Sequence, residues 1–123
     1  MACPPTCGAA AAVLVSEAFA KKHGLDASVR IRAQAMTTDT PVAFESRDMR
    51  EVVGFSMTRS AASQVYEAAG VSPQDIGVVE LHDCFAHNEL LTYDALGLCP
   101  EGGAEQFVED GDNTYGGKVV TKQ

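Results

Sequence analysis

The segment from residue 76 to residue 97 constrains the fold of this chain more than any other. Its first part, residues 76–81, is a short and mostly apolar run of the kind that forms a buried strand. His82 and the three residues after it are followed at once by a helical pattern that reaches about Leu96, and Gly97 is placed to end that helix. A strand that leads directly into a helix is the unit of an α/β protein.

Capping residues predict three further helical segments. Ser16 is a suitable N-cap for a helix at about residues 16–23, and Gly24 is placed to end it. Alanines at helical spacing predict a second helix over residues 57–69. The sequence Ser-Pro-Gln-Asp at residues 72–75 predicts a brief helical turn with an N-terminal cap.

The remaining segments predict strands and connections. The apolar run at residues 8–15 has two interpretations, a helix from its alanine content or a short buried strand. Residues 28–35 alternate between apolar and polar, which predicts a strand with one wet face. We expect connections at residues 37–56 and a loop at residues 98–117. Together these elements indicate an α/β layered fold without internal repeats.

Acidic residues are concentrated in the second half of the chain. The formal net charge is −8, and residues 60–117 hold eleven Asp and Glu but no Lys or Arg. Two interpretations stay open, a solvated face or a face that meets a basic surface on another domain or partner. The charge argues against nucleic acid as the main partner.

No apolar run approaches the ~20 residues of a membrane helix. The first residues lack the basic and then apolar order of a secretory signal, which favours a cytosolic-type or organelle-matrix protein.

Candidate chemistry is concentrated at residues 82–85, because ligands of α/β sheets bind where strands end and helices begin. His82 has two interpretations, a donor to a developing oxyanion or a structural histidine under a helix. Asp83 is expected to cap the helix or to orient the imidazole. Cys84 is expected to be an apolar filler rather than a nucleophile, because residues 82 and 84 are too close in the chain to align as a dyad.

The four cysteines are Cys3, Cys7, Cys84 and Cys99. An even number of cysteines is compatible with disulfides. Disulfides form in oxidising compartments, and without a secretory signal nothing in the sequence indicates such a compartment. The spacing of Cys3 and Cys7 is not the paired pattern of a zinc site, so we expect no metal.

Several of these segments resemble one enzyme family. The sequences VELHDCFAHNELLTYDALGLCPEG (residues 79–102) and GDNTYGGK (residues 111–118) are similar to thiolases of the sterol carrier protein X type. Upstream, GAAAA at residues 8–12, SEAF at 16–19 and VGFSM at 53–57 resemble the same family. The resemblance covers nearly the whole chain. It implies an incomplete thiolase-like layered fold with a mixed β-sheet and packed helices, in which residues 1–24 end the N-terminal half and residues 25–123 form part of the C-terminal domain.

The resemblance also implies an activity and a site. Members are acyl-CoA acyltransferases that cleave 3-oxoacyl-CoA with coenzyme A, in peroxisomes, on branched-chain and sterol side-chain substrates. By this resemblance His82 stabilises the oxyanion, and Asp83, Cys84 and Phe85 support it. Coenzyme A thioesters are the expected substrates, no cofactor is bound permanently, and the expected partners include a homo-oligomer or a full-length thiolase.

The sequence also departs from the family pattern. The nucleophilic Cys belongs to an N-terminal half that this sequence does not contain, and no Gly-His-Pro block follows Lys118. Cys7 stands where the family has Asp, and the peroxisomal C-terminal tripeptide is missing. We therefore expect the isolated chain to be an inactive fragment, because covalent acyl transfer needs both nucleophile and base. The alternative is a non-catalytic interaction or lipid-binding module that pairs with a full-length thiolase.

Overall fold

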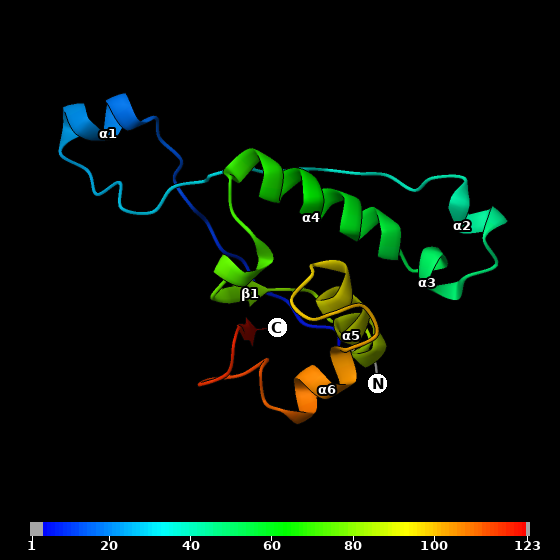
Figure 1. The fold of residues 1–123 in the computed structure, drawn as a ribbon. Coiled ribbons are helices and arrows are strands. Elements are labelled where there is room, and N and C mark those ends of the chain that lie inside the picture. Colours follow the sequence, from blue (N-terminus) through cyan, green and yellow to red (C-terminus); the bar gives the residue numbers. More distant parts are fainter. Residues whose placement is uncertain (1–3, 123) are drawn as a thin grey trace.

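The computed structural model describes residues 4–122 of the chain. Figure 1 shows a long helix, α4, above a second layer that holds β1, α5 and α6, with α1 set apart at one side. The elements in chain order are α1 (Glu17–His23), α2 (Val42–Glu45), α3 (Met49–Val52), α4 (Phe55–Ala69), a 3-10 turn (Pro73–Asp75), β1 (Val78–Glu80), α5 (Ala86–Ala95), α6 (Ala104–Glu109) and β2 (Val120–Lys122).

The capping residues place the helices as predicted. Ser16 precedes α1, and its hydroxyl accepts a hydrogen bond from the Phe19 N–H at 3.2 Å. Gly70 ends α4 in the left-handed region at φ 65°, a conformation that glycine adopts without steric cost. At the 3-10 turn the Asp75 carboxylate accepts the Ser72 N–H at 2.8 Å. The predictions for these three segments are confirmed, and α4 begins two residues earlier than expected.

The sheet is smaller than the sequence patterns predict. Among the described residues β1 and β2 form a two-stranded parallel sheet, with Val78 opposite Val120 and Glu80 opposite Lys122. The expectation of a mixed sheet is therefore wrong for this part of the chain. Residues 8–15 and 28–35 are not strands, although the second has the alternation of one. Alternation makes a segment able to pair, but a strand also needs a partner, and no described segment pairs with residues 28–35.

Two predicted connections contain structure. Residues 37–56 hold the short helices α2 and α3, and the predicted loop at 98–117 holds α6. Helix α6 forms because Ala104 and Phe107 both become buried against the core. Packing therefore outweighs the glycine-rich flanks that suggested a loop.

The glycine-rich motif at residues 111–117 makes a tight turn that returns the chain to the sheet. A Cβ atom built on Gly117 would lie 2.2 Å from the Gly111 carbonyl oxygen, so only glycine fits there. The Val119 N–H then donates to the Asp112 carbonyl at 2.9 Å, and Val120 begins β2. This motif has a structural role in bringing β2 beside β1.

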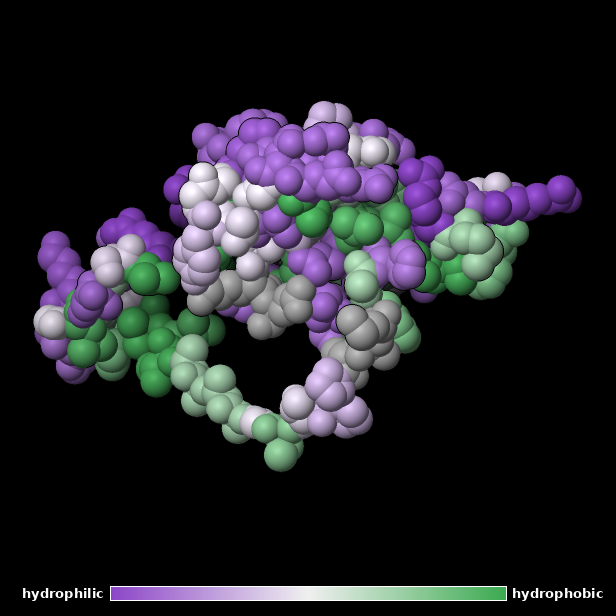
Figure 2. All heavy atoms as spheres, turned by 90° about the horizontal axis from the view of Figure 1, so that it is seen from below, coloured by the Kyte–Doolittle hydropathy of each residue, from purple (hydrophilic) through white to green (hydrophobic). Residues whose placement is uncertain are grey.

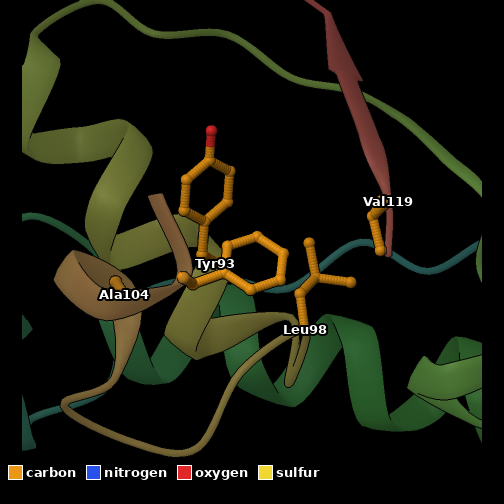
Figure 3. Close-up of a cluster of buried hydrophobic side chains, with 5 residues drawn as sticks. Tyr93, Leu98, Ala104 and Val119 are labelled. Atoms are coloured by element: carbon orange, nitrogen blue, oxygen red, sulfur yellow. The ribbon is translucent and has the colours of Figure 1, made fainter. Parts of the chain in front are cut away.

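The core is formed by side chains from α5, α6 and the segments that follow each of them. Tyr93, Leu98 and Val119 belong to one cluster of buried side chains, which Figure 3 shows. The Tyr93 ring meets the Phe107 ring edge to face, with centroids 5.4 Å apart. The Tyr93 hydroxyl donates to Glu89 and accepts a hydrogen bond from Asn113 Nδ2 at 3.2 Å. This cluster therefore joins α5, α6 and the C-terminal segment.

Several contacts attach helix α4 to the rest of the fold. It packs along α5, and the Tyr66 hydroxyl donates to the Leu96 carbonyl at 2.8 Å. Arg32 donates to the Ala69 carbonyl at the C-terminal end of α4, also at 2.8 Å. Glu101 pairs with Arg50 and Arg59 at 3.1 and 3.2 Å. In the described part of the chain no helix has the length and apolar character to cross a membrane.

Candidate functional site

The four predicted site residues lie in the loop that joins β1 to α5. Strand β1 ends at Glu80 and helix α5 begins at Ala86, so the predicted order of strand, polar loop and helix is confirmed. Phe85 occupies the cap position of α5 and makes no side-chain capping bond. The expectation that Asp83 caps this helix is therefore wrong, because the helix starts three residues beyond it. In the first turn of α5 the Asn88 N–H instead donates to the Phe85 carbonyl at 2.8 Å.

His82 is tied to the helix through its backbone. The Asn88 side-chain amide, in the first turn of α5, donates to the His82 carbonyl at 3.2 Å. The His82 side chain itself is exposed. The loop therefore has a fixed connection to α5, while the imidazole stays accessible to a molecule outside this chain.

A mainly apolar hollow of about 460 Å³ lies beside this loop. Its lining comes from the loop, from α5 and from the end of α3: Val53, Cys84, Phe85, His87, Asn88 and Leu91. Phe85 is 57% exposed and borders it. The structure thus brings Cys84 and Phe85 together around one concavity, and His82 and Asp83 do not line it.

Two polar residues of the hollow, His87 and Asn88, were not singled out from the sequence. His87 and Asn88 lie three and four residues beyond Cys84, and Leu91 follows at the same spacing. Residues three and four apart share one face of a helix. Helical spacing counted back from Leu91 within α5 was therefore the signal that identifies His87 and Asn88.

The cysteines differ in environment. Cys99 donates its thiol hydrogen to Asp94 Oδ1 at 3.0 Å, and burial together with this carboxylate raises the pKa of the thiol to about 12. Cys7 is exposed, and Cys3 lies outside the described residues. Within residues 4–122 no hydrogen bond joins Cys84 to a histidine. The same residues contain no cluster of three or more His, Cys, Asp or Glu able to hold a metal ion.

The arrangement supplies hydrogen-bond donors and an apolar hollow rather than a covalent centre. An accessible imidazole is a donor that stabilises negative charge on oxygen. At the hollow, Cys84 makes no hydrogen bond to a histidine among the described residues, so it is not paired with an imidazole base that would activate it as a nucleophile. A short parallel sheet, two helices packed side by side and this loop form an α/β segment, the class that the resemblance to thiolases implies.

Comparison with known proteins agrees with that class. The family model "Thiolase C-terminal domain-like" matches residues 40–122. The chain belongs to this thiolase family.

Relatives with curated names extend the match over nearly the whole chain. The chain is 57% identical over 119 residues to "Sterol carrier protein 2" of Homo sapiens, covering 96% of this chain and 22% of that protein. It is 46% identical to "Non-specific lipid-transfer protein-like 2" of Caenorhabditis elegans, covering 96% and 29%. It is 40% identical to "Benzoylsuccinyl-CoA thiolase subunit BbsB" of Thauera aromatica, covering 92% and 28%. These matches confirm the resemblance drawn from the sequence, and the chain spans less than a third of each relative.

A solved structure with a related sequence shares part of the fold. The "Ltp2-ChsH2(DUF35) aldolase" superposes with a TM-score of 0.50 at 33% identity, over 52% of this chain and 17% of that one. An incomplete thiolase-like α/β fold is therefore established for this chain.

Proposed function

We propose that this chain supplies the oxyanion-binding segment of a thiolase-type acyltransferase that acts on coenzyme A thioesters. One observation carries the proposal: the loop with His82 stands between the end of β1 and the start of α5, beside an apolar hollow. The name of one relative, a benzoylsuccinyl-CoA thiolase subunit, supports the substrate class.

In this proposal each group of the loop has a separate task. The His82 imidazole donates a hydrogen bond to the thioester oxygen as negative charge develops on it. Asn88 is a positioning residue, since its amide holds the His82 carbonyl. The hollow bordered by Cys84 and Phe85 receives an apolar part of the acyl thioester. The nucleophilic Cys and the Gly-His-Pro base are not in this sequence, so the chain alone has no covalent step.

Three further statements belong to the same proposal. Residues 1–24 end the N-terminal half of such an enzyme and residues 25–123 belong to its C-terminal domain, a division supported by a family match that begins at residue 40. The protein acts in the peroxisome, as the resemblance implies. It binds no cofactor permanently, and coenzyme A is a substrate.

The test replaces the matching segment of the Homo sapiens relative with this chain and measures loss of acetoacetyl-CoA in the presence of coenzyme A. We expect the chimera to cleave the substrate and the isolated chain to be silent. His82→Ala in the chimera lowers kcat by about 10²–10³ with little change in KM, which is the cost of one oxyanion donor. His23→Ala, on exposed helix α1, is the matched control and leaves kcat unchanged. Equal kcat values for the two variants, or a chimera without activity while its parent is active, contradict the proposal.

A second candidate is a non-catalytic interaction or lipid-binding module that pairs with a full-length thiolase. It is favoured by the eleven acidic residues at positions 60–117, and by relatives named as sterol carrier and lipid-transfer proteins. A pull-down against the intact Homo sapiens relative tests it, with the acidic residues between 67 and 112 neutralised in a second sample. Failure to retain the relative in either sample removes this candidate.

A further inference from the structure

The loop that holds His82 is attached at its two ends to different elements. It leaves β1 after Glu80 and enters α5 at Ala86. The position of a residue in such a loop depends on how the strand and the helix are fixed relative to one another. Figure 1 and Figure 2 both show helix α1 at the left, apart from the body that contains β1 and α5, so α1 gives this loop no support.

One buried hydroxyl links the strand side and the helix side of the loop. Tyr93, on α5, is fully buried, and its hydroxyl lies 3.1 Å from the Thr121 hydroxyl on β2. Strand β2 in turn pairs with β1, with Thr121 opposite Val79. The Tyr93 hydroxyl therefore joins helix α5 to the strand that pairs with β1.

The same hydroxyl has partners on the helix and on the glycine-rich turn. It donates to the Glu89 carboxylate, one turn earlier on α5, and accepts a hydrogen bond from Asn113 Nδ2 at 3.2 Å. The Asn113 carbonyl accepts the Thr121 hydroxyl at 2.9 Å and the Thr121 N–H at 3.1 Å. Burial raises the pKa of Tyr93 above its ordinary value, so its hydroxyl remains a donor at neutral pH. We call Glu89, Tyr93, Asn113 and Thr121 the Tyr93 cluster.

The first turn of α5 carries this link to His82. Asn88 directly precedes Glu89, and its side-chain amide donates to the His82 carbonyl at 3.2 Å. The Asn88 N–H also donates to the Phe85 carbonyl at 2.8 Å, at the other end of the same loop. A rotation of α5 about its axis therefore moves the anchor of His82 relative to β1.

The Tyr93 cluster restrains the direction of α5, which apolar packing does not do as strictly. Tyr93 meets the Phe107 ring in the core, and this burial holds the helix in place. The hydrophobic effect is non-directional, whereas hydrogen bonds require both a distance of about 2.7–3.2 Å and a favourable angle. A buried polar network in which each group has a partner makes its surroundings rigid.

We propose that Tyr93 is a positioning residue of the thiolase-type site, which fixes the orientation of α5 relative to β1 and thereby the place of His82. The turn at residues 111–117 takes part through Asn113, and β2 takes part through Thr121. None of the side chains in the Tyr93 cluster lines the hollow beside the loop, so they act through the loop and not by contact with a substrate. This inference rests on the oxyanion role proposed for His82.

The test uses the chimera described above with Tyr93→Phe, which removes the hydroxyl and keeps the ring that packs on Phe107. We expect kcat to fall between about tenfold and a hundredfold with little change in KM, since a misplacement of about 1 Å can cost a hundredfold. Thr121→Val, which removes the partner on β2, is expected to lower kcat in the same direction. Tyr66→Phe is the matched control and keeps the parent kcat, because it removes a hydroxyl that joins α4, not β2, to the end of α5.

A double-mutant cycle separates positioning from a general structural effect. In a chimera that already carries His82→Ala, Tyr93→Phe is expected to change kcat less than about twofold, because the imidazole that it positions is absent. Equal losses in the two backgrounds show that the hydroxyl acts on the fold alone and overturn the inference. An unchanged kcat for Tyr93→Phe, while His82→Ala is impaired, also overturns it and leaves the proposed function in place. If His82→Ala itself keeps the full kcat, the proposed function fails and this inference fails with it.

Hydrogen exchange of the full chain gives a readout that needs no chimera. Tyr93→Phe is expected to speed exchange of the Asn88 amide, which donates to the Phe85 carbonyl, and Tyr66→Phe is expected to leave that rate unchanged. A cooperative urea transition for each variant verifies that the core is kept. Exchange at residues 81–88 that is the same in Tyr93→Phe and wild type contradicts the positioning role.

Discussion

The most direct test of the fold is truncation of Phe107 to alanine. Phe107 is only 4% exposed and meets the fully buried Tyr93 ring edge to face. A buried phenylalanine removes about 200 Å² from water, which at about 25 cal/mol per Å² is about 5 kcal/mol. Alanine retains about 1 kcal/mol of that, so we expect a loss of about 4 kcal/mol, within the range of measured Phe-to-Ala substitutions.

This loss is large relative to the stability available. Domains of this length have free energies of unfolding of about 6–18 kcal/mol, and the described core of this chain is small. Phe107→Ala therefore removes much of the stability and releases α6, because Ala104 alone cannot hold that helix against the core.

Urea unfolding followed by circular dichroism measures the change, with tyrosine fluorescence as the second probe because the chain has no tryptophan. Val108→Ala is the matched control on the same helix, since Val108 is 40% exposed, and we expect it to cost less than about 1 kcal/mol. A loss below about 1 kcal/mol for Phe107→Ala, or equal losses for the two variants, would refute the packing described for α6.

Three further predictions follow from the electrostatics. Asp94→Asn is expected to speed alkylation of Cys99 by N-ethylmaleimide at pH 8, because it removes a carboxylate that raises the pKa of this thiol. Exposed Cys7 is the control and reacts at an unchanged rate. Equal alkylation rates at Cys99 in wild type and variant contradict this prediction. The free energy of unfolding is expected to fall as the pH rises above about 9. Folding raises the pKa of Cys99 to about 12 and that of Tyr93 above its ordinary value, so the unfolded chain loses protons at lower pH than the folded chain. Urea midpoints at pH 7.5, 9 and 10 measure this change, and a midpoint that rises with pH contradicts the prediction. Glu101→Gln is expected to shift the urea midpoint only slightly, and the shift disappears in 0.5 M NaCl, because the ion pairs of Glu101 with Arg50 and Arg59 are exposed to solvent. A large shift that persists in salt would show that these ion pairs are shielded from solvent.

The candidate site was predictable in part. The order of strand, polar loop and helix around His82 follows from local pattern, and it agrees with the structure. The hollow was not predictable, because it needs Val53 from a distant part of the chain to lie against Phe85 and Leu91. The start of α5 at Ala86, and with it the loss of a capping role for Asp83, was also decided by how the loop is held.

The sequence by itself determined the elements whose ends are set by local chemistry. Ser16 and Gly24 bound α1, Gly70 ends α4, and the 3-10 turn follows from Ser72 and Asp75. A cap or a left-handed glycine acts over a few residues, so these signals are complete within the sequence.

Only the tertiary structure decided which apolar segments became strands and which apparent loop became a helix. Residues 28–35 have the alternation of a strand and remain unpaired, whereas Val120–Lys122 became β2 after the turn at Gly117 brought it to β1. Helix α6 exists because Phe107 packs on Tyr93. A strand needs a partner edge and a short helix needs a surface to pack on, and neither is a property of the segment itself.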